Sequence, residues 1–144
     1  MDLKIIAVGK VKDRALLQKC EEYAAKIRFD AKIEIIEIKD ADKEAEGAKI
    51  IDRLNKEKAH VATLDEHGRT FTSREFARRL AAINKRIVFI IGGPAGLSDK
   101  VREAADERIA LSSMTFTHEI ARMLLLEQVY RALSILKNRK YHKD

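Results

Sequence analysis

The residues of this chain best suited to chemistry form a glycine-rich segment, 92–96, which reads Gly-Gly-Pro-Ala-Gly. It follows five consecutive apolar residues, 87–91, which predict a strand buried on both faces. Glycine lets the backbone approach a ligand closely, and open α/β sheets bind ligands at the carboxyl ends of their strands. Two further segments, beginning after Leu64 and at Leu111, are predicted to follow strands at the same edge. The three segments together predict a pocket for a small ligand.

Other kinds of catalysis find no support in the sequence. The chain has neither a P-loop nor the Gly-x-Gly-x-x-Gly pattern of dinucleotide-binding loops. Its four histidines are scattered, without the spacing of metal ligands, so the sequence predicts no metal site. No serine lies in a nucleophile elbow. Cys20 falls on the apolar stripe of a predicted helix, where we interpret it as a small buried hydrophobe.

Length and composition indicate a single globular domain, 1–144, with 46% hydrophobic and 36% charged residues. No apolar run approaches the roughly 20 residues of a membrane span. The N-terminus lacks the basic and apolar segments of a signal peptide. A lone cysteine cannot form an internal disulfide, which agrees with a reducing cytosol. We therefore expect a cytoplasmic protein with no membrane partner.

The net charge is +6, and much of the excess lies at the C-terminal end. A basic terminus is typical of proteins that bind a polyanion such as nucleic acid. Charge alone leaves a second interpretation open, namely a lysine-rich surface that only keeps the protein in solution. The basic residues from 131 onward, opposed there only by Asp144, are Arg131, Lys137, Arg139, Lys140 and Lys143.

Strand and helix patterns alternate along the chain, which predicts an α/β fold with a mostly parallel sheet flanked by helices. Thr72 and Glu75 form a capping box that marks a helix start, and Ser98 is a candidate cap of the next helix. The predicted strands are 3–8, 33–38, 60–64, 86–91 and 108–111; the predicted helices begin near 13, 44, 73, 99 and 118; 40–47 is expected to be a loop and 65–68 a turn.

The last predicted helix, 118–137, carries apolar residues on more than one face. A helix with that pattern must be covered on several sides. One side is expected to lie on the sheet, and another is available to a second subunit. Glu127 and Arg131 form a favourable i,i+4 pair on the face that stays exposed.

Taken together, the segments after three predicted strands resemble the RlmH family, the large-subunit ribosomal RNA pseudouridine methyltransferases of the SPOUT superfamily. The resemblance extends over essentially the whole chain. Thr117 and Lys140 depart from the family pattern, which usually has proline at the first position and proline or a small residue at the second. The matching residues are 7–10, 63–65 with Gly68, 91–98, 111–118, Arg122, 126–128, 130–132 and 141–143.

The resemblance implies a SPOUT-type domain whose C-terminal part is threaded into a trefoil knot, an arrangement that general topology rules disfavour. It also implies a homodimer and S-adenosylmethionine as the methyl donor. The reaction would be methylation of N3 of a pseudouridine in large-subunit ribosomal RNA, within assembled ribosomes. The implied cofactor contacts are Leu64, Gly92, Leu111, Ser112, Ser113, Met114, Thr115 and Phe116.

The catalytic candidates are Tyr141 and His142, at the end of the basic tail. A partner subunit could bring this tail over the cofactor, where His142 could accept a proton and Tyr141 could stack on the base or hydrogen-bond to it. Without the resemblance, these residues would read as a frayed terminus. The residues expected to contact RNA are Arg122, Arg139, Lys140 and Lys143.

Two alternatives stay open at this point. The same chemistry could act on another RNA, such as transfer RNA. A protein of a different class, a basic RNA- or ribosome-binding protein without catalysis, would also fit the charge pattern.

Overall fold

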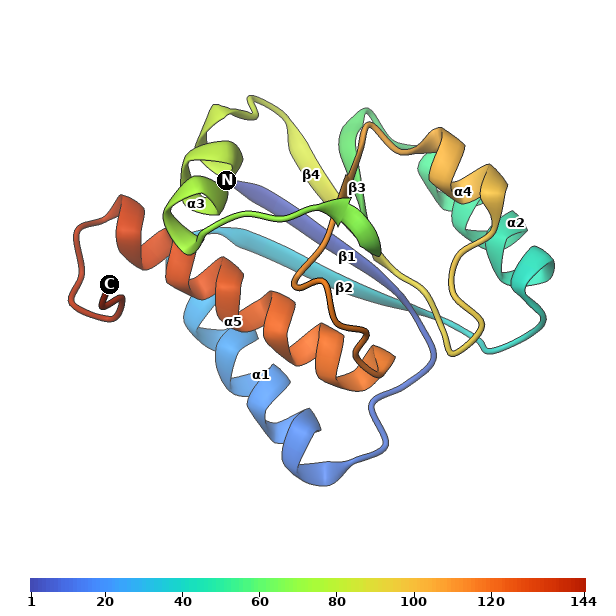
Figure 1. Ribbon diagram of the computed structural model, residues 1–144, viewed down its shortest axis with the longest axis horizontal. Helices are drawn as coiled ribbons and strands as arrows, with labels where there is room; N and C mark the ends of the chain where they lie inside the picture. The colour runs from blue at the N-terminus through green and yellow to red at the C-terminus, as the bar shows by residue number, and fades with distance from the viewer.

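A sheet of five parallel strands, in the order β2-β1-β4-β3-β5, forms the centre of the computed structural model, which describes residues 1–144 (Figure 1). Helices alternate with the strands along the chain, so the predicted α/β class is confirmed. The elements are β1 Asp2–Val8, α1 Arg14–Arg28, β2 Lys32–Ile38, α2 Lys43–Leu54, β3 Ala59–Arg69, α3 Ser73–Ala82, β4 Arg86–Ile91, α4 Asp99–Ala104, β5 Glu107–Ile109 and α5 His118–Leu136.

The helices cover both faces of the sheet. In Figure 1, α1, α3 and α5 lie on one face, and α2 and α4 lie on the other. The larger hydrophobic core fills the first face, where Phe89 of β4 meets Leu125 and Leu126 of α5. The smaller core lies beneath α2 and α4 and includes Ile90 of β4 and Val101 of α4. Residues 87–91 of β4 and 5–8 of β1 therefore form continuous apolar runs, because both faces of these strands are buried.

Local sequence signals fix the helix starts. Thr72 accepts a hydrogen bond from the Glu75 backbone N–H and Glu75 accepts one from Thr72, so the predicted capping box is confirmed. Ser98 caps α4 as predicted, with its hydroxyl accepting from the Val101 N–H at 3.3 Å. Thr117 caps α5, the longest helix.

Two predicted boundaries are wrong. The segment 65–68 does not end the third strand, because β3 continues to Arg69 and pairs a second time with Ile109 of β5 after a register shift. Gly68 permits this approach, since a Cβ there would lie 2.6 Å from the Arg108 backbone. Gly47 was expected in a loop but lies inside α2, where a Cβ would meet the Ser98 hydroxyl at 2.4 Å.

Helix length and composition also bear on the membrane question. None of the helices combines the length and apolar character needed to cross a membrane.

Candidate active site at the carboxyl edge of the sheet

A cavity of about 950 Å³ lies at the carboxyl ends of β3 and β4, beside the start of α5. The connection after β1 leads to α1 on one face of the sheet, whereas the connection after the neighbouring β4 leads to α4 on the other face. Such a switch in direction opens a crevice, the place where open α/β sheets bind ligands. The volume lies at the upper end of the range of small-molecule sites, about 300–1,000 Å³.

The three predicted segments meet in this cavity. Seven of the eight residues implied as cofactor contacts line it: Leu64, Gly92, Leu111, Ser112, Met114, Thr115 and Phe116. Ser113 belongs to the same segment but is exposed and is not part of the lining. The segments predicted to form a pocket therefore do meet in one cavity, and their contact with a cofactor stays a prediction.

The loop after β4 owes its shape to glycine. A Cβ at Gly92 would lie 2.9 Å from the carbonyl carbon of Gly96 and 3.0 Å from the Leu97 side chain, so no larger residue fits without a shift of backbone. Gly96 has φ +79°, in the left-handed region that favours glycine. Its N–H donates to the Gly93 carbonyl at 2.9 Å, which closes a tight turn over the cavity.

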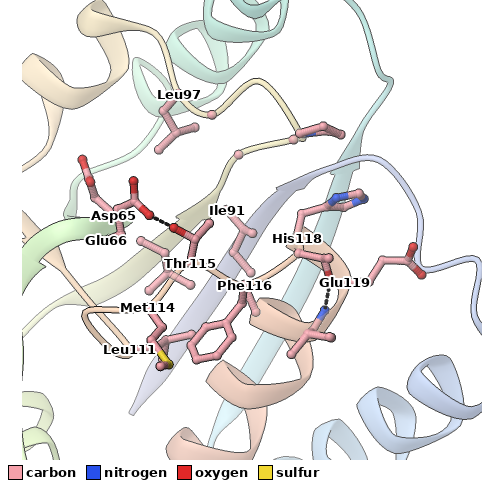
Figure 2. Close-up of a pocket in the computed structure, with 18 of the residues that line it drawn as sticks. Asp65, Glu66, Ile91, Leu97, Leu111, Met114, Thr115, Phe116, His118 and Glu119 are labelled. Atoms are coloured by element: carbon pink, nitrogen blue, oxygen red, sulfur yellow. Dashed lines mark hydrogen bonds between the residues drawn. The ribbon is translucent and has the colours of Figure 1, made fainter.

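Two hydrogen bonds at its ends hold the segment 111–116 across the cavity. The Ala110 N–H donates to the Arg69 carbonyl at 2.9 Å, which ties the segment to the extension of β3. The Thr115 hydroxyl donates to the Glu66 carboxylate, and Figure 2 shows this contact crossing between the two loops. The lining loops therefore support one another.

Asp65 forms a polar wall of the cavity at the point where β3 meets its bulge. Its carboxylate accepts from the Arg102 guanidinium at 3.1 Å and from the His67 N–H at 3.0 Å. Burial alone would raise the pKa of Asp65, but these two partners outweigh it and lower the pKa below its ordinary value. Asp65 is therefore an ionised carboxylate whose two oxygens both have partners inside the chain.

The first turn of α5 supplies the opposite wall, with His118 and Glu119 in the lining. Glu119 accepts from the backbone N–H groups of Asp13 at 3.0 Å and Lys12 at 2.6 Å. The hydrogen bond from Asp13 is the main cause that lowers the pKa of Glu119. This carboxylate joins the loop after β1 to α5.

The sequence predicted the segment that begins with Asp65 as part of the pocket, but it assigned no role in the site to Asp65, His118, Glu119 or Arg102. The available signals were the position of Asp65 directly after an apolar strand and the presence of Asp65 and His118 in segments that resemble the family. The involvement of the others depends on the fold, since α4 and the start of α5 reach the cavity from different faces of the sheet.

The predicted catalytic residues Tyr141 and His142 are not among the residues that line this chain's cavity. Tyr141 packs edge-on against Tyr130, with ring centroids 4.8 Å apart. Its hydroxyl donates to Glu127 at 3.1 Å and lies 3.3 Å from the Tyr23 hydroxyl. Burial, followed by the hydrogen bonds to Tyr23 and Glu127, raises the pKa of Tyr141. Within one chain, the tail is docked along the second half of α5.

Two partners hold the ring of His142. Its Nδ1 lies 3.2 Å from the Arg131 guanidinium, and its Nε2 lies 3.1 Å from Asp144. Asp144 in turn accepts two hydrogen bonds from Arg74 of α3, at 2.8 and 2.7 Å. Asp144 thus links the C-terminal tail to α3.

The predicted RNA contacts divide into two groups. The prediction for Arg122 is wrong, because its side chain is buried, with only 5% of it exposed, and donates to Glu37 at 2.7 Å and to the Gly9 carbonyl at 2.8 Å. Arg139 is half-exposed but paired with Asp30. Lys140 and Lys143 are exposed, as a phosphate contact requires.

Comparisons with known proteins agree with this architecture. Residues 1–142 match the family model described as "Predicted SPOUT methyltransferase". A probable methylase family protein of Haemophilus influenzae has the same fold, with a TM-score of 0.61 at 14% identity over 99% of this chain and 70% of its own. The SpoU methyltransferase AviRb of Streptomyces viridochromogenes, solved with AdoMet, gives a TM-score of 0.52 at 12% identity over 90% of this chain and 57% of its own.

The chain belongs to the SPOUT methyltransferase family. Within it, the chain is similar over its full length to proteins named ribosomal RNA large subunit methyltransferase H. Those of Clostridium perfringens and Bacillus pumilus are 38% and 39% identical, over 99% of this chain and all of each relative. The protein of Phocaeicola vulgatus is 38% identical over the whole of both chains. The family resemblance inferred from sequence is confirmed.

Proposed function

We propose that this protein transfers a methyl group from S-adenosylmethionine to N3 of a pseudouridine in large-subunit ribosomal RNA. The observation that carries the proposal is the cavity itself. The second half of β3 and the loops after β4 and β5 form it at one edge of the sheet. The chain belongs to a methyltransferase family, and its full-length relatives are named for ribosomal RNA.

The lining suits the chemical parts of S-adenosylmethionine. Leu64, Ile91, Leu97 and Phe116 offer apolar surface for an adenine ring, and the irregular backbone of 111–116 offers polar groups for its edge. Carboxylates of the lining suit the ammonium group of its amino acid portion and its positively charged sulfur. The tight packing around Gly92 keeps a backbone surface where a ligand can approach closely. The residues that would hold the cofactor are therefore those of the three loops.

When bound, the cofactor supplies an activated methyl on a positively charged sulfur, a good leaving group. The protein's contribution is to hold the target nitrogen in line with that methyl and to help the nitrogen lose its proton. This alignment requires residues that bind the target nucleobase at the mouth of the cavity.

We assign the binding of the nucleobase to Tyr141 and His142 of a second copy of the chain. In its own chain, Tyr141 packs on Tyr130, twelve residues and about 18 Å along α5 from His118 in the cavity wall. In a homodimer that places the tail of one chain beside the cavity of the other, Tyr141 and His142 reach a cavity that they do not reach in their own chain. The half-buried residues Ile120 and Leu124 on α5 leave apolar surface for such an interface.

The trefoil knot and the cellular site belong to the same proposal. The segment 111–117 passes from β5 to α5 beside both the β3 extension and the loop after β4, as a threaded C-terminal segment would. A protein that modifies ribosomes works in the cytoplasm. The exposed Lys140 and Lys143 fit contacts to RNA phosphates there.

Methyl transfer to ribosomes tests the proposal. Purified bacterial ribosomes that lack the modification are incubated with the protein and isotopically labelled S-adenosylmethionine, and labelled nucleosides are mapped by mass spectrometry. We expect label on N3 of one pseudouridine of the large-subunit RNA. Label only on transfer RNA or another nucleotide would support the alternative target. Binding to ribosomes with no label in any RNA would instead support a non-catalytic ribosome-binding protein.

A further inference from the structure

We propose that His118 is a catalytic residue, the imidazole that accepts the N3 proton of the target base. The inference rests on the proposed function and assigns to His118 the proton-accepting role that the sequence predicts for His142. It comes from the geometry of the cavity wall and from an account of which acceptors there are already occupied.

His118 is the first residue of α5 and lines the cavity, half-buried. Figure 2 shows its ring rising from the first turn of the helix toward the loop that follows β4, at the opposite side of the cavity from Asp65 and Glu66. It therefore shares the cavity with the residues implied to hold the cofactor. No side chain or backbone group of the chain hydrogen-bonds to its ring.

The carboxylates of the cavity are all engaged. Asp65 accepts from Arg102, and Glu66 accepts from the Thr115 hydroxyl. Glu119 accepts two backbone N–H groups, and Asp13 caps α1 by accepting from the Leu16 N–H. A proton acceptor must offer a free lone pair within reach of the base. Protonation of any of these four carboxylates would weaken a hydrogen bond that holds the cavity wall, whereas protonation of the His118 ring disturbs no such contact.

The other histidines are no better placed. His60 pairs with Glu107 at 2.8 Å and is not part of the cavity lining. His67 does line the cavity, but its side chain is 81% exposed at the rim and its Nε2 lies 3.4 Å from Glu66. Among the cavity residues, His118 alone combines a ring held in the wall with no partner.

The geometry at His142 argues against the role first expected for it. An arginine side chain only donates hydrogen bonds, so Nδ1 of His142 accepts from Arg131. In the neutral ring, the proton therefore sits on Nε2 and is donated to Asp144. Both nitrogens are occupied, and the docked ring has no lone pair for a second proton. His142 is better suited to contacting the base than to deprotonating it.

A ring nitrogen of His118 takes the N3 proton while the nitrogen's electron pair forms the bond to the methyl carbon. The carbon–sulfur bond breaks, and its electrons stay on sulfur, which becomes a neutral thioether. The imidazolium then returns the proton to water. The charged and titratable groups that line the same cavity are Glu119 on α5, Asp13 before α1, Asp65, Glu66 and His67 on β3, and Arg102 on α4.

Substitution of His118 by Asn and, separately, by Gln tests this assignment in the full-length protein with ribosomes as substrate. We expect the single-turnover rate at pH 7 to fall by about 10²- to 10⁴-fold, as for loss of a general base. The dissociation constant for S-adenosylmethionine, measured by calorimetry, should stay within about threefold. That binding also checks that each variant is folded.

The pH profile separates a base from a structural residue. The wild-type rate should rise with pH and level off once the general base is unprotonated. The rate of the variants should keep rising at higher pH, because N3 of the target nucleobase then loses its proton without help. The difference in rate between the variants and wild type should therefore narrow. His60→Gln, the same kind of change outside the cavity, should follow the wild-type profile.

Two results would overturn the assignment. One is an unchanged rate and profile in both His118 variants. The other is a rate loss that saturating S-adenosylmethionine restores, which would make His118 a cofactor ligand instead. Both outcomes presuppose an active wild-type enzyme. Absence of methyl transfer by the wild type would contradict the proposed function, not this inference alone.

Discussion

Arg122 illustrates how a residue that resembles an RNA contact in sequence can serve the fold instead. From the second turn of α5, its guanidinium reaches Glu37 on β2 and the buried carbonyl of Gly9 after β1. Gly9 has φ +80°, a conformation that favours glycine, and it turns the chain toward α1. Arg122 thus ties the loop after β1 to the helix that forms a cavity wall.

Replacing Arg122 by Ala should therefore lower stability rather than RNA affinity. The Gly9 carbonyl would lose its donor inside the protein, and we expect the free energy of unfolding to fall by about 2–4 kcal/mol. Urea unfolding measures the change. Arg78→Ala, which removes an exposed arginine, should stay within about 0.5 kcal/mol of wild type. A loss as small for Arg122→Ala would contradict this role.

At the scale of elements, Asp30 clamps the end of α5 to the end of α1. Its carboxylate accepts from Arg139 at 2.6 and 2.7 Å and pairs with Lys137 at 3.0 Å. Asn138, with φ +54°, turns the chain out of the helix between these two cations. The clamp fixes where the C-terminal tail begins.

This clamp predicts a dependence of stability on pH. The hydrogen bond from Arg139 is the main cause that lowers the pKa of Asp30 from 3.8 to about 2. Because the folded state has the lower pKa, the stabilisation is complete above about pH 4 and is lost as the pH falls toward 2. Asp30→Asn should cost about 1–2 kcal/mol at pH 7 and progressively less between pH 4 and pH 2.

Denaturant unfolding of wild type and Asp30→Asn across pH 2 to 7 checks this prediction. Asp52→Asn is a matched control, because Asp52 pairs only with Lys56 on the surface of α2. A gap between wild type and Asp30→Asn that stays constant over this range would show that the carboxylate charge contributes nothing.

Most of the elements could be predicted from sequence, since apolar runs and caps are local signals. The five strands and the starts at Thr72 and Ser98 are of this kind. The extension of β3 could not, because an acidic, glycine-containing segment has low strand propensity and pairs only once β5 lies beside Gly68. Gly47 lies in a helix for a similar reason, its missing side chain leaving room for Ser98.

The candidate site was predictable only in part, because some of its residues come together only through tertiary packing. Loops that follow parallel strands must meet at one edge, so the gathering of Leu64, Gly92 and Leu111 follows from the fold class. The roles of Arg102 and His118 depend on how α4 and α5 pack, which no local pattern encodes. The docking of Tyr141 on Tyr130 likewise required the three-dimensional structure.

At the scale of the molecule, the account requires two chains for one complete site. Sedimentation equilibrium at micromolar concentrations should give the mass of a dimer, twice 16.4 kDa. A monomer there would contradict the shared site.

Mixing two inactive variants tests the sharing directly. Gly92→Val damages the cavity, and Tyr141→Ala damages the tail. In a mixed dimer, the intact cavity of the Tyr141→Ala chain faces the intact tail of the Gly92→Val chain. Once the mixed variants have exchanged subunits, a substantial part of the methylation activity that each variant lacks should therefore return. Activity that stays at the level of the separate variants would show that each chain works alone.

Calorimetric titration of the protein with S-adenosylmethionine tests the central claim most directly, because every step above depends on a cavity that binds it. The account predicts saturable binding that Gly92→Val abolishes without unfolding the protein, since a side chain there collides with Gly96 and Leu97. Ala95→Ser, an exposed change in the same loop, should bind nearly as well as wild type. A folded wild-type protein that binds no S-adenosylmethionine, or a Gly92→Val variant that binds it unchanged, would contradict the account.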